Sequence, residues 1–385
     1  MAPLANRRID PRGIFRMRLS QRRSLINSSG IRKIFDLAST MKNPINLSIG
    51  LPDFDVPDAV KECAIAAIRG GKNRYTLTAG TPQLREAVRE YYRKRDVPFD
   101  DVLIASGTSG GLFLVFLALL DPGDEVLILD PYFVMYEALV KFIGAKPVLV
   151  DTYPDFKITR EALEKAATPK TKLLILNSPS NPTGHVYTEA ECRIAAEFAE
   201  SRGIEVLSDE IYEPFCYDGD FVSPAKFFKA PITISGLSKS VGMTGWRVGW
   251  VAGPSDLMKA ITDIQQYTFV CAPSFAQEAA IEGLKHDMRA TNDDYRKRRD
   301  LIYGGLVDAG YNVEKPGGAF YIFPEAPGGD GDAFVLDAIK NNLLIVPGSV
   351  FSARKSHFRI SFAAAPDTLR AGIGVLAKLA AQYKG

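Results

Sequence analysis

This sequence of 385 residues is 46% hydrophobic and 24% charged, and its 47 basic and 45 acidic side chains leave a formal net charge of +2. Such a composition excludes an intrinsically disordered chain, and the even charge balance gives no sign of a nucleic-acid-binding surface. The four cysteines and three histidines are too scattered for a disulfide scaffold or a zinc site, which favours a reducing compartment such as the cytoplasm.

Two segments have the composition of targeting or membrane segments. Residues 1–30 contain seven arginines, one aspartate and no glutamate, a bias that organelle transit peptides share; we favour a solvated arm that leads into a helix at 31–38. Residues 102–120 carry no charge, but the Ser, Gly and Thr residues of 106–111 divide them, which predicts a buried strand, a turn and a buried helix. We therefore expect no membrane span.

From about residue 100 onward, short aliphatic runs alternate with longer segments of helical periodicity. Unbroken apolar runs are typical of strands that are buried on both faces. The runs expected to form such strands are 102–105, 126–129, 173–176, 204–208, 232–235 and 248–252. Helical periodicity between them, as in 189–199, predicts a mostly parallel α/β sheet with helices on both faces and ligands at the carboxyl ends of its strands.

The pattern changes after about residue 285, where a charged helix and shorter strands predict a second, smaller α+β domain. The expected elements are a helix at 294–306, strands at 320–323 and 358–361, a closing helix at 367–383 and an exposed loop at 326–332. The expected division is an N-terminal arm and helix that joins the smaller domain (1–46), a large domain (47–284) and the small C-terminal domain (285–385).

Four turns at predicted strand ends carry polar residues that an inert sheet does not need. Ser106–Gly111 lies between a buried strand and a buried helix, so its small residues and the helix N-terminus suit a phosphate, although it matches neither the P-loop nor G-x-G-x-x-G. In Asn177–Gly184, turn chemistry explains the prolines and the glycine but not Asn181 at the ligand edge of the sheet.

The other two turns carry a carboxylate and an amine. Asp209 leaves an apolar strand and has to be paired, either as a helix N-cap or with a ligand, because a bare buried carboxylate is costly. Lys239 follows a strand in a small-residue setting with Arg247 nearby. Desolvation at this edge lowers the pKa of such a lysine and makes its amine a usable nucleophile.

Taken together, these residues resemble the class I pyridoxal-phosphate-dependent aminotransferases of fold type I. The motifs that carry the resemblance, in the order of that family, are Asn46–Phe54, Tyr75, Asp121–Val126, Asn181–Gly184, Asp209–Tyr212, Ser238–Lys239, Thr244–Arg247, Gly317–Tyr321 and Arg359–Ser361. The resemblance implies a large domain built on a mostly parallel seven-stranded sheet flanked by helices, plus a smaller α+β domain. It also implies ping-pong transfer of the amino group of an L-amino acid (aspartate, aromatic or related) to a 2-oxo acid such as 2-oxoglutarate.

The resemblance also implies roles around the ring of pyridoxal 5′-phosphate. Lys239 is expected to hold the cofactor as a Schiff base and to shuttle the substrate proton, and Asp209 to pair with the pyridine nitrogen and keep it protonated. Tyr212 and Asn181 are expected to donate hydrogen bonds to the 3′ oxygen, and Phe133 to stack on the ring.

The phosphate and the substrate carboxylate have their own expected partners. The residues implied for the phosphate are Gly107, Thr108, Ser109, Ser238 and Arg247, with Tyr75 contributed by the neighbouring subunit of a homodimer. Arg359 is implied as the fork for the α-carboxylate, helped by the Gly50 backbone and by Asn181. The chain departs from the family at Gly236, where relatives often carry serine, and no cation can be assigned to a distal substrate carboxylate.

Two rival interpretations stay open. Gly107–Gly111 also satisfies G-x-S-x-G, so Ser109 and His357 give a remote α/β-hydrolase alternative, which leaves Asn181, Lys239 and the other motif residues without roles. The second rival keeps the cofactor and changes the reaction, because β-lyases and cyclopropane-forming synthases share the scaffold and most of these residues. We favour transamination.

Overall fold

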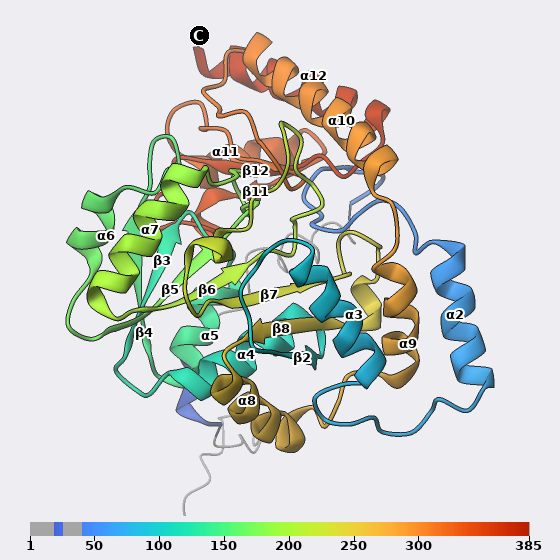
Figure 1. The fold of residues 1–385 in the computed structure, drawn as a ribbon. Helices are drawn as coiled ribbons and strands as arrows, with labels where there is room; N and C mark the ends of the chain where they lie inside the picture. The colour runs from blue at the N-terminus through green and yellow to red at the C-terminus, as the bar shows by residue number, and fades with distance from the viewer. Residues whose placement is uncertain (1–18, 26–40, 385) are drawn as a thin grey trace, which may run out of the picture.

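The computed structural model describes residues 19–25 and 41–384 (Figure 1). The helix expected at 31–38 therefore lies outside the described residues, as does most of the arginine-rich arm. Residues 102–120 form a strand, a turn and a helix as expected, and no helix in the described part of the chain is long and apolar enough to cross a membrane.

A seven-stranded sheet forms the centre of the molecule (Figure 1). Its strands, in spatial order, are β2 (Asp101–Ala105), β8 (Gly249–Gly253), β7 (Ile232–Gly236), β6 (Glu205–Asp209), β5 (Thr171–Asn177), β3 (Glu125–Asp130) and β4 (Lys146–Asp151). Strand β8 is antiparallel to both of its neighbours, and the other pairs are parallel. The mostly parallel sheet expected from the sequence is confirmed.

Helices cover both faces of this sheet, which explains its unbroken apolar runs. One face carries α4 (Gly107–Leu119), α5 (Met135–Ile143) and α8 (Ser255–Thr268); the other carries α2 (Asp58–Arg69), α3 (Pro82–Arg93), α6 (Arg160–Ala166), α7 (Glu189–Arg202) and α9 (Ser274–Gly283). Successive strand residues point to opposite faces. On β3, for example, Ile128 packs with the first set of helices and Leu127 with the second.

The C-terminal region packs shorter strands against three helices. Its elements are β9 (Tyr321–Ile322), β10 (Leu343–Leu344), β11 (Val346–Pro347), β12 (Phe358–Ser361), α10 (Arg289–Asp308), α11 (Gly331–Lys340) and α12 (Pro366–Lys384). Strands β11, β12 and β9 form an antiparallel sheet, whereas β10 pairs in parallel with β1 (Ile45–Asn46) from the N-terminal part of the chain. Short 3-10 turns complete the fold at Gln21–Leu25, Pro224–Phe227, Thr244–Trp246 and Gly348–Val350.

The exposed loop expected at 326–332 is only partly a loop. Ala326 is buried in the C-terminal core, and Gly331 and Asp332 already belong to α11. The reason is the side chain of Asp330, which accepts a hydrogen bond from the Ala333 backbone N–H (3.0 Å) and so caps the helix. The glycines of this segment predicted a loop up to residue 332, but the cap starts the helix at Gly331, so the loop ends two residues earlier than expected.

The direction of the strands gathers polar segments at one edge of the large sheet. The carboxyl ends of β2, β5, β6 and β7 share this edge, and β8 begins there because it runs the opposite way. The shared edge of these strand ends agrees with the ligand site expected from the sequence.

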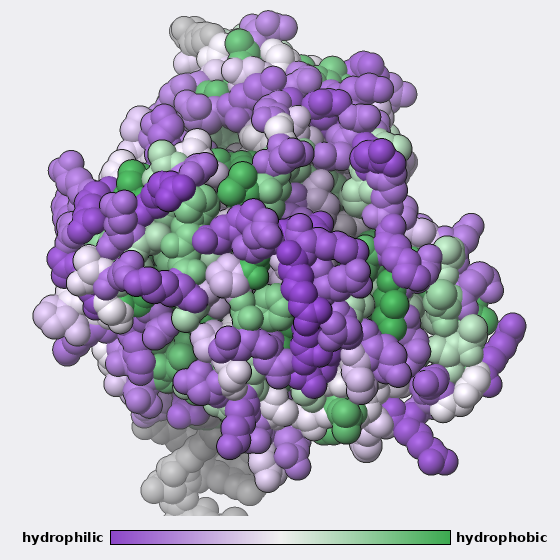
Figure 2. Space-filling model, viewed as in Figure 1, coloured by the Kyte–Doolittle hydropathy of each residue, from purple (hydrophilic) through white to green (hydrophobic). Residues whose placement is uncertain are grey.

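The face of the molecule seen in Figure 2 is mostly hydrophilic, with hydrophobic side chains in small separate groups.

Candidate active site

A cavity of about 340 Å³ lies at these strand ends. The residues that line it are Gly50, Leu51, Thr108, Ser109, Phe133, Tyr136, Asn177, Asn181, Asp209, Ile211, Tyr212, Ser238, Lys239, Thr244, Arg247, Tyr321 and Arg359. Segments from the large sheet supply most of the walls, and β9 and β12 of the C-terminal region close the remaining side. The cavity thus brings together the sequence-predicted site residues except Gly107 and Tyr75.

Lys239 presents its amine inside this cavity. Its Nζ donates to the carbonyl oxygen of Gly50 at 2.8 Å. Burial, together with the positive charges of Arg359 and Arg247, lowers the pKa of Lys239 to about 8, against the attraction of Asp209. An appreciable part of the amine is therefore unprotonated near neutral pH, as a nucleophilic lysine requires.

Asp209 ends strand β6 with its carboxylate almost fully buried. One oxygen accepts from the Tyr136 hydroxyl (2.7 Å) and the other from the Ile211 backbone N–H (3.2 Å). Both donors are neutral, and burial raises the pKa of Asp209 to about 6. A protonated ring nitrogen would supply the cation that this carboxylate needs to stay ionised, so the residue fits its expected role.

The turn between β2 and α4 is built to receive an anion together with Arg247. The helix starts at Gly107, and its N-cap residue Ser106 makes no side-chain cap, so Thr108 and Ser109 reach the cavity with the first-turn N–H groups. Gly107 has a φ of +70°, and a Cβ there would lie 2.3 Å from Nη2 of Arg247. Gly107 therefore serves by letting the arginine approach rather than by lining the cavity.

Arg359 is a buried cation whose hydrogen bonds are incomplete. Nη1 donates to Oδ1 of Asn181 (2.9 Å) and Nη2 to the carbonyl oxygen of Ser48 (3.0 Å). Its Nε is buried without a hydrogen-bond partner, and burial lowers the pKa of the group. A carboxylate ligand would satisfy both the charge and this N–H, as expected for a substrate fork.

Two buried tyrosines complete the site and were given no role by the sequence. Tyr136 lies in the first turn of α5, three residues after Phe133, and its hydroxyl donates a hydrogen bond to Asp209. Its closeness in sequence to Phe133 could have pointed to it. Tyr321 belongs to a family motif, yet nothing local predicts that its hydroxyl lies 2.9 Å from that of Tyr212. These contacts place a phenol beside each of the two groups expected to face the cofactor ring.

The departure at Gly236 has a steric cause. A Cβ at this position would lie 2.9 Å from the Gly249 Cα, at the start of β8, and 3.0 Å from the carbonyl oxygen of Val248, the residue before it. A serine at this position would therefore have to displace this backbone in this chain.

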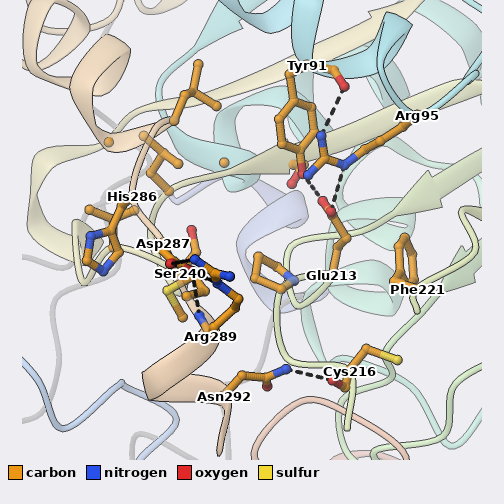
Figure 3. A pocket seen from close by; sticks show the side chains of 18 of the residues that line it. Tyr91, Arg95, Glu213, Cys216, Phe221, Ser240, His286, Asp287, Arg289 and Asn292 are labelled. Atoms are coloured by element: carbon orange, nitrogen blue, oxygen red, sulfur yellow. Dashed lines mark hydrogen bonds and ion pairs between the residues drawn. The ribbon is translucent and has the colours of Figure 1, made fainter. Parts of the chain in front are cut away.

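A second cavity, about 430 Å³, is lined in part by Leu237, Ser240 and Val241, from the segment that carries Lys239 (Figure 3). Four of the charged residues in its walls are paired: Glu213 accepts hydrogen bonds from Tyr91 and Arg95, and Asp287 pairs with Arg289 (Figure 3). It contains none of the predicted site residues. The smaller cavity is therefore the better candidate for the active site.

The hydrolase alternative lacks its base. Ser109 lines the cavity, but His357 does not. The His357 ring stacks on Phe323 in the C-terminal region, with centroids 5.1 Å apart, and burial lowers its pKa to about 4. A histidine held in this way is a packing residue.

Comparison with known proteins agrees with this site. The family model for aminotransferase class I and II matches residues 42–374. A probable aspartate aminotransferase of Methanocaldococcus jannaschii is 39% identical over 94% of this chain and 99% of its own length, and aromatic-amino-acid aminotransferase 2 of Thermococcus litoralis is 37% identical over 96% and 100%. The structure of the Thermus thermophilus aspartate aminotransferase with maleate superposes with a TM-score of 0.89 at 34% identity, covering 94% of this chain and 100% of that one.

Proposed function

Because the chain belongs to the class I and II aminotransferase family, we propose that Lys239 is the residue that binds its cofactor covalently and moves the substrate proton. The protein is a pyridoxal-phosphate-dependent enzyme that transfers an amino group between an amino acid and a 2-oxo acid. When bound, the cofactor withdraws electrons from the substrate Cα. The protein binds and orients the cofactor and the substrate, and it supplies the base. The observation that carries the assignment of Lys239 is its buried amine of lowered pKa in the same cavity as Asp209 and Arg359.

The remaining roles belong to residues that line the same cavity. Asp209 would pair with the ring nitrogen, Tyr212 and Asn181 would hold the 3′ oxygen, and Phe133 would cover a face of the ring. The phosphate would be held by Gly107, Thr108 and Ser109 at the start of α4, together with Ser238 and Arg247. Arg359, with Gly50 and Asn181, binds the α-carboxylate.

The test of Lys239 uses borohydride reduction of the holoenzyme and peptide mapping. The label is expected on the peptide that contains residue 239, and Lys239→Ala is expected to bind the cofactor without covalent attachment and to lose transamination. A label on another lysine, or turnover by the variant without added amine, would remove Lys239 from this role. Consumption of the 2-oxo acid, without release of pyruvate and ammonia, distinguishes transamination from a β-lyase.

We further propose that the active unit is a homodimer in which Tyr75 reaches the neighbouring phosphate site. Tyr75 lies outside the cavity of its own chain with 84% of its surface exposed, and Tyr267 is 86% exposed. The segment after Tyr75 is nevertheless held firmly, because the Gln277 side chain binds both Thr76 and Thr81. An anchored segment that presents an exposed aromatic side chain suits a contact with a second copy.

Mixed dimers test this arrangement directly. Tyr75→Ala and Lys239→Ala are each expected to be impaired, and a mixture refolded together is expected to regain activity. In the mixed dimer, one of the two sites combines an intact Lys239 with an intact Tyr75 from the other chain. Activity no higher than the sum of the two homodimers would contradict the shared site.

The domain division and the substrates are also proposals. The pairing of β1 with β10 supports a small domain formed by 1–46 and 285–385, and the sheet and its helices support a large domain at 47–284. Relatives named as aspartate and aromatic-amino-acid aminotransferases support aspartate or an aromatic amino acid as the donor. We propose 2-oxoglutarate as the acceptor. A panel of amino donors with one acceptor tests the substrates.

The four unpaired cysteines support a cytoplasmic location, which cell fractionation tests.

A further inference from the structure

Tyr321 connects three groups of the site. Its side chain is 1% exposed, and its hydroxyl lies 2.9 Å from the Tyr212 hydroxyl and 3.4 Å from the Gly50 carbonyl oxygen. The guanidinium carbon of Arg359 lies 4.5 Å from the centre of the Tyr321 ring. Tyr321 is on β9 of the C-terminal region, whereas Tyr212 follows β6 of the large sheet, so this hydroxyl pair joins two parts of the fold.

The two phenols have only two protons to distribute. A tyrosine hydroxyl donates one hydrogen bond and can accept others. The Gly50 carbonyl oxygen lies 3.4 Å from the Tyr321 hydroxyl, whereas the Tyr212 oxygen lies 2.9 Å away, and either hydroxyl of that pair can donate. The shorter contact favours donation from Tyr321 to the Tyr212 oxygen, which leaves the Tyr212 proton free to point into the cavity.

We propose that Tyr321 is a positioning residue whose hydroxyl donates to Tyr212 and directs the single Tyr212 proton toward the 3′ oxygen of the cofactor. The inference rests on the proposed role of Tyr212 and assigns to Tyr321 a task that acts only through it. A phenol that accepts a hydrogen bond becomes a stronger donor, since neighbouring hydrogen bonds polarise one another. Tyr321 thereby strengthens the hold of Tyr212 on a negative ring oxygen.

Gly50 permits this arrangement. A Cβ at residue 50 would lie 2.7 Å from the Tyr321 hydroxyl oxygen and 3.6 Å from the next ring atom, so the hydroxyl alone occupies the space. Gly50→Ala therefore displaces the hydroxyl of Tyr321, whereas Tyr321→Phe deletes it. Two different substitutions can thus remove the same hydrogen bond.

The test is a pH titration of the visible absorbance of cofactor bound to Lys239. A strong donor on the ring oxygen stabilises its negative charge, which lowers the pH at which the neighbouring nitrogen loses its proton. Tyr321→Phe is expected to raise the midpoint by about half a pH unit, the range of one hydrogen bond. Gly50→Ala is expected to raise it in the same direction, and Tyr212→Phe to raise it further.

The double variant decides whether Tyr321 acts through Tyr212. In a Tyr212→Phe background, Tyr321→Phe is expected to cause no additional shift. The matched control is Tyr311→Phe, which loses a buried hydrogen bond to the Leu376 carbonyl (2.9 Å) away from the cavity and is expected to leave the midpoint unchanged. An unchanged midpoint in Tyr321→Phe, or an equal shift with and without Tyr212, would overturn the inference. Lys239→Ala tests the proposed function separately: this variant is expected to lose the absorbance of the covalently bound cofactor, whereas Tyr321→Phe is expected to keep that absorbance and change only its midpoint.

Discussion

The amine of Lys239 donates a 2.8 Å hydrogen bond to the carbonyl oxygen of Gly50, a residue 189 positions earlier in the chain. The loop that carries Gly50 is held against α10 by Asp53. This residue accepts a hydrogen bond from Tyr295 (2.6 Å) and forms an ion pair with Arg298 (2.5 Å). The amine is thus oriented by a segment that the C-terminal region holds in place. Movement of that region would alter the surroundings of the amine as well as those of Arg359.

The pKa of Lys239 predicts how apoenzyme reacts with pyridoxal phosphate. Only the neutral amine attacks, so the rate of covalent attachment is expected to rise with pH up to about 8 and then to level off. An ordinary lysine would continue to gain reactivity toward pH 10.5. Stopped-flow absorbance across this range measures the profile, and a rate that still climbs at pH 10 would contradict a desolvated amine.

The pair of Tyr136 and Asp209 predicts a pH-dependent affinity for the cofactor. Burial raises the pKa of Asp209 to about 6 and the Tyr136 hydrogen bond opposes this rise, so affinity is expected to fall as the pH drops through about 6. Tyr136→Phe removes the opposing bond, and the fall is expected to begin at a higher pH. Equilibrium dialysis at several pH values gives the profile.

The control for this prediction is Tyr92→Phe. Tyr92 is equally buried and accepts a 2.9 Å hydrogen bond from Trp250, but it does not line the cavity. If both variants shift the profile alike, the effect belongs to general stability and not to Asp209.

The proposed role of Arg359 predicts that its substitution weakens the binding of both substrates. Lysine keeps the charge but not the planar fork, so Arg359→Lys is expected to raise KM about tenfold or more for amino and 2-oxo acids alike. The control is Arg354→Lys at the exposed pair with Asp151, which is expected to leave both values unchanged. A KM change confined to one amino acid would place Arg359 near the side chain of the substrate instead of its α-carboxylate.

Gly236 predicts that restoring the residue common in relatives will not help. Gly236→Ser forces a side chain against the backbone at 248 and 249 and is expected to cost about 1–3 kcal/mol of stability, with no gain in cofactor affinity. Gly304→Ser, where a Cβ meets nothing within 4 Å, is the control for introducing serine. Thermal unfolding with and without cofactor measures both quantities, and tighter binding by Gly236→Ser would refute the steric explanation.

Patterns along the chain predicted the large sheet well because strands covered on both faces need unbroken apolar runs. Strand β4 was not predicted, because its apolar run, Val148–Val150, is only three residues long; it is the edge strand beside β3, and several of its residues are only half-buried. Local patterns were less informative about the site. Motifs at strand ends identified Asp209 and Lys239, but the partners Tyr136 and Gly50 belong to other segments.

Contacts between distant segments could not be read from the sequence. The hydrogen bond from Arg359 to Asn181 joins residues 178 positions apart, and the Tyr212–Tyr321 pair joins residues 109 apart. Family motifs placed these residues in one site without specifying which atoms meet. The missing information is the packing of the C-terminal strands onto the large sheet, which no local pattern encodes.

The reversal of β8 has a consequence for which molecules fit. One connection, from Gly236 to Gly249, carries both Lys239 and Arg247, and the register of β7 with β8 fixes its two ends. The proposed attachment point and the proposed anion contact therefore keep a fixed separation along one short stretch of backbone. A congener of the cofactor that lacks phosphate would lose the proposed contact at Arg247, and a longer one could not engage both Lys239 and Arg247 without changing how the two strands pair.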